Sequence, residues 1–321
     1  MATLAVRNLS VSYVTASGVL LNAAEDVSFQ VEQGKSLGIV GESGCGKTTV
    51  MMALLRLLPE AGRIIRGEVI LEGEELLKYS EADMCAVRWA QIAMVFQGAM
   101  NALNPVRTIE SQIAEALRIH GVEKGRERER AGELLELVGI SPTRGRQYPH
   151  QYSGGMRQRA VIAMALACQP RVLIADEPTT ALDVMIQAQI LRLLVQLQKE
   201  LNLALVIVTH DLGVVAEICD DVLVMYAGRV AEIGTSDAIY NGPQHPYTRR
   251  LLQAFPDIEN PHAELLSIPG VPPRLDDLPP GCRFAPRCHS CQDRCLRETP
   301  LLIERSPGHS VACHLDYRKI G

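Results

Sequence analysis

The chain of 321 residues has no apolar run long enough to cross a lipid bilayer. Its longest run covers the nine residues 160–168, about half of the roughly 18 that a membrane-spanning helix needs. The first residues also lack the basic start, apolar block and small-residue cleavage site of a secretory signal. We therefore expect the protein in the cytosol, where disulfides are rare.

An excess of positive charge is absent as well. The chain carries 32 Lys and Arg against 37 Asp and Glu, which gives a formal net charge of −5. This balance argues against a protein whose main role is to coat a phosphate backbone, although a local basic patch could survive it. The sequence contains no internal repeat, and its 47% hydrophobic and 21% charged residues are typical of a globular protein.

The composition changes near residue 235. Twelve of the 18 prolines fall in the last 86 residues, whereas the first 235 residues alternate strand-like and helix-like segments. We expect one compact domain over 1–235 and a loop-rich extension over 236–321, in keeping with the chain length.

The first 235 residues have the pattern of an α/β domain. Short apolar runs followed by loops and helical stretches predict a largely parallel sheet. Only helical signals occur between 107 and 168, which predicts an inserted helical subdomain over about 98–168. A hairpin is expected around Gly228, from 221–227 and 229–233. The expected strands are 4–13, 26–31, 35–40, 92–96, 172–175 and 204–209, and a helix is expected over 47–58.

The strongest motif runs from Gly41 to Thr48, in the letters GESGCGKT, directly after an apolar strand and before a helix. It matches the phosphate-binding pattern G-x-x-x-x-G-K-[ST]. Its glycines let main-chain N–H groups converge on phosphate oxygens, and the helix N-terminus adds partial positive charge. Lys47 is expected to reach the β- and γ-phosphates and Thr48 to bind Mg²⁺. The alternative is a glycine-rich turn that only caps a helix.

Two carboxylates follow the buried strand 172–175. Asp176 stands where a second ligand of Mg²⁺ is expected, and Glu177 stands where it could orient an attacking water. By itself, an acidic pair after a strand is usually a solvated loop or a helix cap. The phosphate-binding motif in the same chain favours the functional interpretation.

A second candidate anion site begins with Tyr152 and continues with Ser153, Gly154 and Gly155, just before a helix. A serine and two glycines at a helix start can cap the helix or bind an anion. Two phosphate-binding surfaces in one chain make sense if nucleotides are sandwiched between two copies or two related chains.

In the order of these motifs the chain resembles the ATP-binding subunit of an ABC transporter, across residues 1 to about 235. The resemblance implies an α/β fold, with a P-loop NTPase (RecA-like) core, an antiparallel β subdomain, an inserted helical subdomain and a proline-rich, cysteine-containing C-terminal extension. It implies that Tyr13 stacks on adenine, that Asp183 lies in the D-loop, and that Gln97 senses Mg²⁺ and the transmembrane partner. His210 would contact the γ-phosphate and position Glu177. The implied nucleotide-binding residues are Tyr13, Gly41, Ser43, Gly44, Cys45, Gly46, Lys47, Thr48, Thr49, Gln97, Ser153, Gly154, Gly155, Asp176 and Asp183; the implied catalytic residues are Lys47, Gln97, Glu177 and His210; the implied Mg²⁺ ligands are Thr48, Gln97 and Asp176.

Five of the nine cysteines lie in the last 40 residues. In a reducing compartment such a cluster suggests metal ligation more than disulfides. Zinc and iron–sulfur centres both accept four thiolates, so the spacing does not choose between them. Unliganded cysteines in a loop-rich tail are the remaining alternative. The five are Cys282, Cys288, Cys291, Cys295 and Cys313.

The extension narrows the resemblance to the ATPases of dipeptide and oligopeptide importers, through segments like 244–248 (QHPYT), 268–273 (IPGVPP) and 281–288 (GCRFAPRC). In members of that family that bind a [4Fe–4S] cluster, the four ligands match Cys282, Cys288, Cys295 and Cys313 of this sequence, with Cys291 an extra thiol. The resemblance implies a peripheral ATPase on the cytoplasmic face of the membrane. Its partners would be two transmembrane permease subunits, a second ABC ATPase chain, identical or related, and, indirectly, an extracytoplasmic substrate-binding protein, with no nucleic acid. The alternatives are an importer of oligosaccharides or another solute and, with less support, a soluble ABC ATPase that acts on nucleic acid or ribosomes.

Overall fold

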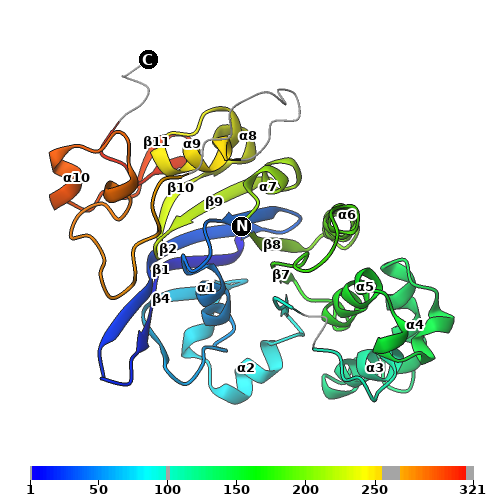
Figure 1. Cartoon of the computed structure of the whole chain (residues 1–321). Coiled ribbons are helices and arrows are strands. Elements are labelled where there is room, and N and C mark those ends of the chain that lie inside the picture. Colours follow the sequence, from blue (N-terminus) through cyan, green and yellow to red (C-terminus); the bar gives the residue numbers. More distant parts are fainter. Residues whose placement is uncertain (1, 99–101, 255–267, 316–321) are drawn as a thin grey trace. The chain divides into compact units, whose positions relative to one another are not determined.

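The computed structural model describes residues 2–98, 102–254 and 268–315. Figure 1 draws the whole chain, which divides into two compact units. Unit one comprises 1–4, 31–36 and 70–208, and unit two comprises 5–30, 37–69 and 209–321.

Unit one contains three parallel strands, β6 (Ile92–Val95), β7 (Val172–Asp176) and β8 (Ala204–Thr209). In their register Ile92 faces Val172, and Val172 faces Ala204. Nearly every residue of these strands is buried, as expected for parallel strands that are covered on both faces. The predicted strands and their parallel pairing are confirmed.

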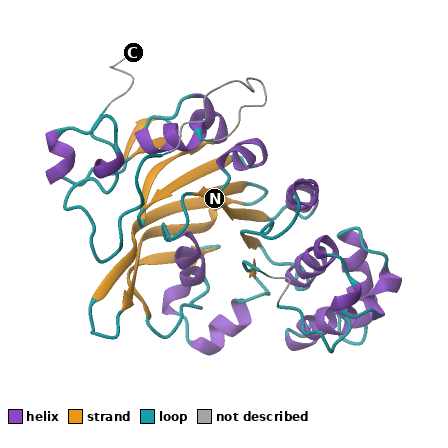
Figure 2. Ribbon diagram, in the orientation of Figure 1, coloured by secondary structure: helices purple, strands orange, loops and turns teal. Residues whose placement is uncertain are grey.

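The segment between β6 and β7 is helical. Its main helices are α3 (Ile109–Ile119), α4 (Glu127–Leu137) and α5 (Gly154–Ala165), which pack on one another. Figure 2 shows this segment as helices and loops, and within residues 102–171 the structure describes no strand. The prediction of helical signals alone is therefore confirmed for the described residues; 99–101 lie outside them. The other elements of unit one are β5 (Glu74–Glu75), η1 (Leu76–Lys78), α2 (Glu81–Val87), η3 (Pro142–Arg146), η4 (Pro149–Gln151) and α6 (Val184–Glu200).

Unit two contains most of an antiparallel layer and a second group of strands. In the first, β1 (Ala2–Val14) lies between β2 (Leu20–Glu32) and β4 (Gly62–Leu71). In the second, β3 (Ser36–Val40) pairs in parallel with β9 (Asp221–Tyr226). The remaining elements are α1 (Lys47–Leu54), α7 (Leu212–Ile218), β10 (Arg229–Thr235), α8 (Ser236–Asn241), α9 (Pro246–Gln253), η5 (Ala285–Arg287), α10 (Asp293–Arg297), β11 (Ile303–Ser306) and β12 (His309–Val311).

Several boundaries differ from the prediction. Helix α1 ends at Leu54 instead of Leu58, because the chain turns at Arg56, whose φ of 52° is left-handed, and Pro59 follows. Strand β2 begins six residues before the predicted 26, and β4 was not predicted. The hairpin of β9 and β10 is confirmed, with Ala227 and Gly228 at positive φ in its turn.

The extension adds two strands that composition did not predict. β12 pairs antiparallel with β10, and β11 pairs with β12, so the two strands extend the sheet beyond β10. The edge of strand β10 is thereby covered by the extension.

A buried carboxylate on β10 attaches the extension. Glu232 has no exposed surface and accepts hydrogen bonds from the main-chain N–H of Gln244 at 2.6 Å and of His245 at 3.0 Å. The Nε2 of His309 lies 2.7 Å from the same carboxylate. Burial works to raise the pKa of Glu232, but the bonds from His309 and the two N–H groups hold it below its usual value. The QHPYT segment is therefore fixed on one ionised side chain.

His245 begins helix α9. Its Nδ1 accepts a hydrogen bond from the N–H of Tyr247 at 3.0 Å, and the side chain is buried. Burial lowers the pKa of His245 to about 4 from the usual 6.5, against the opposing charge of Glu232. The imidazole is therefore neutral in the folded protein at neutral pH.

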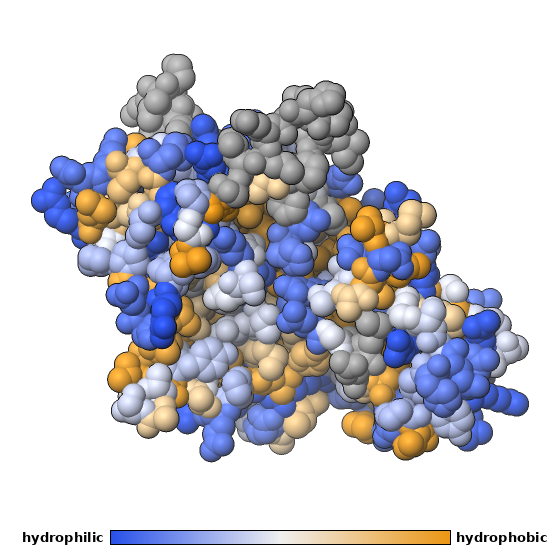
Figure 3. All heavy atoms as spheres, viewed as in Figure 1, coloured by the Kyte–Doolittle hydropathy of each residue, from blue (hydrophilic) through white to orange (hydrophobic). Residues whose placement is uncertain are grey.

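No helix among the described residues is both long and apolar enough to cross a membrane. On the face drawn in Figure 3, hydrophobic and hydrophilic residues are interspersed.

We predict that His245 makes the fold sensitive to mild acid. The unfolded chain takes up a proton near pH 6.5 and the folded chain only near 4, so this contribution to stability is complete above 6.5 and is lost as the pH falls towards 4. His245→Asn keeps a cap acceptor but does not titrate. Between pH 7 and 5 the stability advantage of the parent over this variant should shrink by about 2 kcal/mol, measured by urea unfolding. A constant difference would show that His245 is not buried in its neutral form.

Candidate functional site

The phosphate loop of unit two joins β3 to α1. A Cβ on Gly46, whose φ is 102°, would lie 2.3 Å from the carbonyl oxygen of Ala23, and one on Gly41 would lie 2.2 Å from that of Met225. On Gly44, at φ 79°, a Cβ would meet nothing within 4 Å. One side of the loop is thus packed on backbone, and the side at Gly44 is open.

The start of helix α1 fits a phosphate group. Its N-cap is Gly46, which has no side chain that could accept a hydrogen bond from the N–H groups of the first turn. These donors carry the positive end of the helix dipole. Ser43, Gly44 and Thr48 are exposed beside them. Uncapped N–H groups, an open glycine and exposed hydroxyls together suit a polyphosphate with its metal ion.

Lys47 lies inside the loop. It is only 5% exposed, and its Nζ donates to the carbonyl oxygens of Gly41 at 2.6 Å and Glu42 at 3.2 Å. Cys45 is also buried, and burial raises the pKa of its thiol although Lys47 opposes this. The ammonium group is therefore held by main-chain dipoles of the loop.

The predicted adenine-stacking residue also belongs to unit two. Tyr13 is half-buried, and its hydroxyl lies 3.2 Å from the Oγ1 of Thr49. His210 follows β8 directly and is exposed.

In unit one, Glu177 and Gln97 are in contact. Gln97 Nε2 donates to Glu177 Oε2 at 2.7 Å, and Thr180 Oγ1 donates to the same oxygen at 3.1 Å. Gln97 follows strand β6, and Glu177 and Thr180 follow strand β7. All three lie beyond the carboxyl ends of parallel strands, where α/β sheets bind ligands. Asp176, the last residue of β7, is 1% exposed.

The backbone at Glu177 is unusual. Its φ is 44°, a left-handed conformation that costs about 1–2 kcal/mol for a residue other than glycine. Its N–H donates to the carbonyl oxygen of Val208 at 2.8 Å. Strain that the surroundings maintain is found at functional positions more often than elsewhere.

The Ser-Gly-Gly motif begins helix α5. Ser153 is the N-cap, and its side chain accepts a hydrogen bond from the N–H of Met156 at 3.3 Å. A Cβ on Gly155 would lie 2.7 Å from the Cγ2 of Ile186. Asp183 caps helix α6 in the same way, through the N–H of Ile186 at 3.0 Å. Glycine therefore lets the beginnings of α5 and α6 lie side by side.

The cysteines of the extension influence one another. Burial raises the pKa of Cys282 to about 11, with smaller contributions from Cys295 and Cys313, and the pKa of Cys288 likewise to about 11, with contributions from Cys313 and Cys282. The N–H of Cys282 donates to the carbonyl oxygen of Cys295 at 2.8 Å. Cys291 is exposed. The four predicted ligands are neighbours, yet among the described residues no three side chains are arranged to hold a metal ion.

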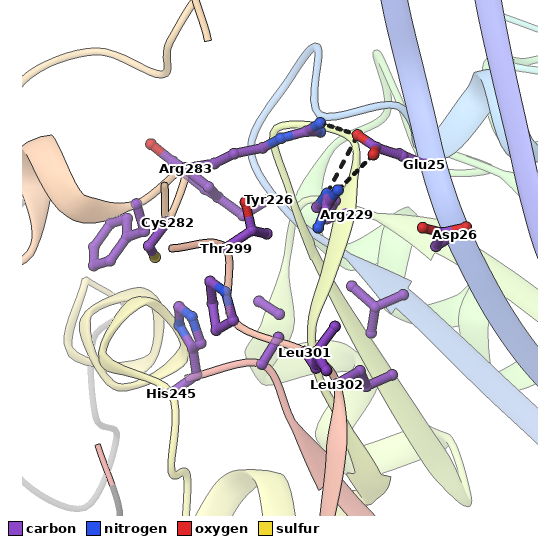
Figure 4. A pocket seen from close by; sticks show the side chains of 15 residues that line it. Glu25, Asp26, Tyr226, Arg229, His245, Cys282, Arg283, Thr299, Leu301 and Leu302 are labelled. Atoms are coloured by element: carbon purple, nitrogen blue, oxygen red, sulfur yellow. Dashed lines mark hydrogen bonds and ion pairs between the residues drawn. The ribbon is translucent and has the colours of Figure 1, made fainter. Parts of the chain in front are cut away.

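A cavity of about 110 Å³ lies beside Cys282 (Figure 4). At its rim Arg229 and Arg283 both bind Glu25 of β2. Its lining contains no residue of the phosphate loop. We interpret it as part of the attachment of the extension.

Sequence reasoning missed the contacts of Glu42. This loop residue forms an ion pair with Arg287, with Nη1 2.6 Å from Oε2. Both residues lie in segments that were singled out, but 245 positions separate them. No periodicity or spacing relates such distant residues.

Comparison with known proteins agrees with this geometry. A family model described as "ABC transporter" matches residues 24–180, and one described as "Oligopeptide/dipeptide transporter, C-terminal region" matches 231–295. Together with a relative that is 50% identical over 96% of this chain, these matches show that the chain belongs to the ABC transporter family, with the C-terminal region of its oligopeptide and dipeptide transporters.

Individual relatives match over nearly their whole length. The chain is 50% identical to a probable peptide ABC transporter ATP-binding protein, y4tR, of Sinorhizobium fredii, covering 96% of this chain and 93% of that one. It is 46% identical to the dipeptide transport ATP-binding protein DppD of Escherichia coli, over 98% and 97%. Among solved structures, the dimeric bacterial ABC transporter cassette MJ0796 is similar with a TM-score of 0.64 and 28% identity, covering 73% of this chain and 98% of that one.

We predict that Gly46→Ala damages the loop far more than Gly18→Ala. Both glycines have positive φ, but a Cβ at Gly18 meets nothing within 4 Å, so that variant bears only the conformational cost. The clash at Gly46 should add at least about 2 kcal/mol of destabilisation in urea unfolding. Gly46→Ala should also abolish ATP binding. Equal destabilisation by the two substitutions would contradict the packing of Gly46 on Ala23.

Proposed function

We propose that the protein is the ATP-hydrolysing subunit of an ABC importer that takes up dipeptides or oligopeptides through separate transmembrane subunits. The observation that carries the proposal is a phosphate loop in a chain that also has the C-terminal region of oligopeptide and dipeptide transporters, matched over 231–295. The names of the relatives, among them three dipeptide transport ATP-binding proteins, support the peptide substrate.

The residues of unit two act on the triphosphate and the base. The N–H groups from Gly44 to Thr49 bind phosphate oxygens, and Lys47 exchanges its main-chain acceptors for the β- and γ-phosphates. Tyr13 stacks on adenine, and His210 contacts the γ-phosphate. The uncapped start of α1 supports this assignment.

The residues of unit one act on the metal and the water. Thr48 of the loop, Gln97 and Asp176 would hold Mg²⁺, which neutralises charge on the β- and γ-phosphates. Glu177 orients the attacking water and accepts its proton. The hydrogen bond of Gln97 to Glu177 supports a functional link between the two.

Ser153, Gly154, Gly155 and Asp183 act on a nucleotide held by a second ATPase chain, either identical or related. The exposed position of Ser153 and the dimeric form of the similar cassette MJ0796 support this arrangement. We place the cassette at 1–235, with its helical subdomain at about 98–168, and the extension at 236–321. Two permease subunits would bind the protein at the cytoplasmic face of the membrane, and a substrate-binding protein would act on their far side.

In the extension, we propose that Cys282, Cys288, Cys295 and Cys313 hold a [4Fe–4S] cluster, with zinc as the alternative. The effects of these thiols on one another's pKa support their closeness, and Cys291 contributes to the pKa of Cys288 as well. A metal centre would fasten a segment that has little core of its own.

We predict that Glu177→Gln abolishes ATP hydrolysis, with a loss of at least about 100-fold, because the amide cannot accept the proton of water. Binding of ATP should persist, because the phosphate loop is unchanged. Phosphate release and binding of a fluorescent ATP analogue measure the two properties. Glu136→Gln, on the exposed surface of α4, is the matched control and should hydrolyse ATP like the parent. A Glu177 variant with parental turnover would remove this residue from its role.

We also predict that Ser in place of Cys282, Cys288, Cys295 or Cys313 releases the metal, whereas Cys291→Ser retains it. Iron, acid-labile sulfide and zinc are measured on anaerobically purified protein. About four irons and four sulfides per chain are expected in the parent and in Cys291→Ser. Equal loss from all five variants would overturn the choice of ligands, and zinc without sulfide would identify the alternative metal.

A further inference from the structure

Two side chains of the extension hold the phosphate loop at Glu42. Arg287 forms a fork with its carboxylate, with Nη1 2.6 Å from Oε2 and Nη2 3.0 Å from Oε1. The main-chain N–H of Glu42 donates to the hydroxyl of Tyr247 at 2.9 Å. Both the side chain and the backbone of this loop residue are therefore fixed by residues more than 200 positions away in the sequence.

The contact with Arg287 is protected from solvent. The side chain of Arg287 is 4% exposed and that of Glu42 is 25% exposed. Arg287 also donates to the Tyr226 hydroxyl at 3.2 Å and to the carbonyl oxygen of Pro269 at 2.8 Å. A buried guanidinium with a bidentate partner and satisfied remaining donors holds its partner in one geometry.

Aromatic rings surround this contact. The rings of Tyr226 and Tyr247 lie 4.6 Å apart, and that of Phe284 lies 5.2 Å from the first and 5.4 Å from the second. Tyr247 and Phe284 come from the extension, and Tyr226 ends β9. This small core makes the position of Tyr247 and Arg287 rigid relative to the loop.

Glu42 in turn positions Lys47 of the phosphate loop. The Nζ of Lys47 donates to the carbonyl oxygens of Gly41 and Glu42, the residues that begin the loop. A rotation of the Glu42 peptide would move one of these two acceptors. Arg287 is therefore connected to Lys47 through Glu42 alone, by an ion pair with its carboxylate and a hydrogen bond to its carbonyl oxygen.

We propose that the C-terminal extension sets the nucleotide affinity of the phosphate loop, with Arg287 and Tyr247 as positioning residues that act on Lys47 through Glu42. The proposal rests on the nucleotide-binding function proposed above. It gives the extension a role in the ATPase cycle that is distinct from binding a metal.

The chain offers a matched control in Arg283. It lies in the same segment as Arg287. Arg283 follows the proposed metal ligand Cys282, and Arg287 precedes the proposed ligand Cys288. The side chain of Arg283 is 10% exposed. Its partners are Glu25 of β2 and the carbonyl oxygen of Ala227 in the β9–β10 turn, and neither belongs to the phosphate loop. Arg283→Met therefore removes a similar buried ion pair of the extension without touching Glu42.

The test measures the dissociation constant for a fluorescent ATP analogue in the full chain, together with KM and kcat for ATP. Arg287→Met should weaken binding about tenfold and raise KM similarly, with kcat within about twofold of the parent. Arg283→Met should leave the dissociation constant within about twofold. Tyr247→Phe, which removes only the hydroxyl, should weaken binding about threefold. Iron content and thermal melting are measured on each variant.

A double substitution separates positioning from general damage. If Arg287 acts through Glu42, Glu42→Gln combined with Arg287→Met should bind nucleotide no more weakly than Arg287→Met alone. Unchanged affinity in both Arg287→Met and Tyr247→Phe, an equal loss in Arg287→Met and Arg283→Met, or additive effects in the double variant would each overturn the inference. If Arg287→Met does not fold, Tyr247→Phe decides by its affinity alone. A parent that binds no nucleotide would overturn the proposed function and this inference with it, whereas failure of the inference alone leaves nucleotide binding intact.

Discussion

The close packing of the phosphate loop on neighbouring backbone is the constraint on which the rest of unit two depends. Gly46 lies against the carbonyl of Ala23 and Gly41 against that of Met225, at distances that no Cβ allows. These two positions therefore require glycine, and the loop lies directly against the neighbouring backbone. β2 supplies one of the contacting carbonyl groups and β9 the other, so the conformation of the loop depends on both strands. The antiparallel layer and the β9–β10 hairpin are thus part of the site as much as the loop itself.

A second buried polar group fixes the extension to this scaffold. Glu232 is ionised without any exposed surface, which is favourable only because three donors converge on it. Two of these donors are main-chain N–H groups of the QHPYT segment and the third is His309 of β12. One carboxylate therefore connects β10, α9 and the last strand of the extension. The aromatic core around Tyr247 then lies next to the loop, which is how a proline-rich tail with few core residues obtains a defined position.

The sequence carried the local features well and the distant ones poorly. The strands around Ile92, Val172 and Ala204 were predicted because buried parallel strands are short uninterrupted apolar runs, and the loop because its glycines and lysine follow a fixed spacing. β4 was missed, since its exposed and buried residues alternate irregularly around Gly67, where the backbone turns to positive φ. β11 and β12 were missed because they are four and three residues long in a segment of prolines and cysteines. The ion pair of Glu42 with Arg287 depends on tertiary packing and leaves no trace in the local pattern.

The charges around the loop explain why an acidic residue is tolerated there. A carboxylate beside an anion-binding loop repels phosphate and competes for the ammonium group of Lys47. In Glu42 both carboxylate oxygens bind the guanidinium of Arg287, whose positive charge offsets the negative charge. Lys47 is left with neutral carbonyls as partners, which a dianionic phosphate can replace at lower cost than a carboxylate. The extension thus supplies a positive charge that keeps the lysine available, and the loop gains rigidity from the same ion pair.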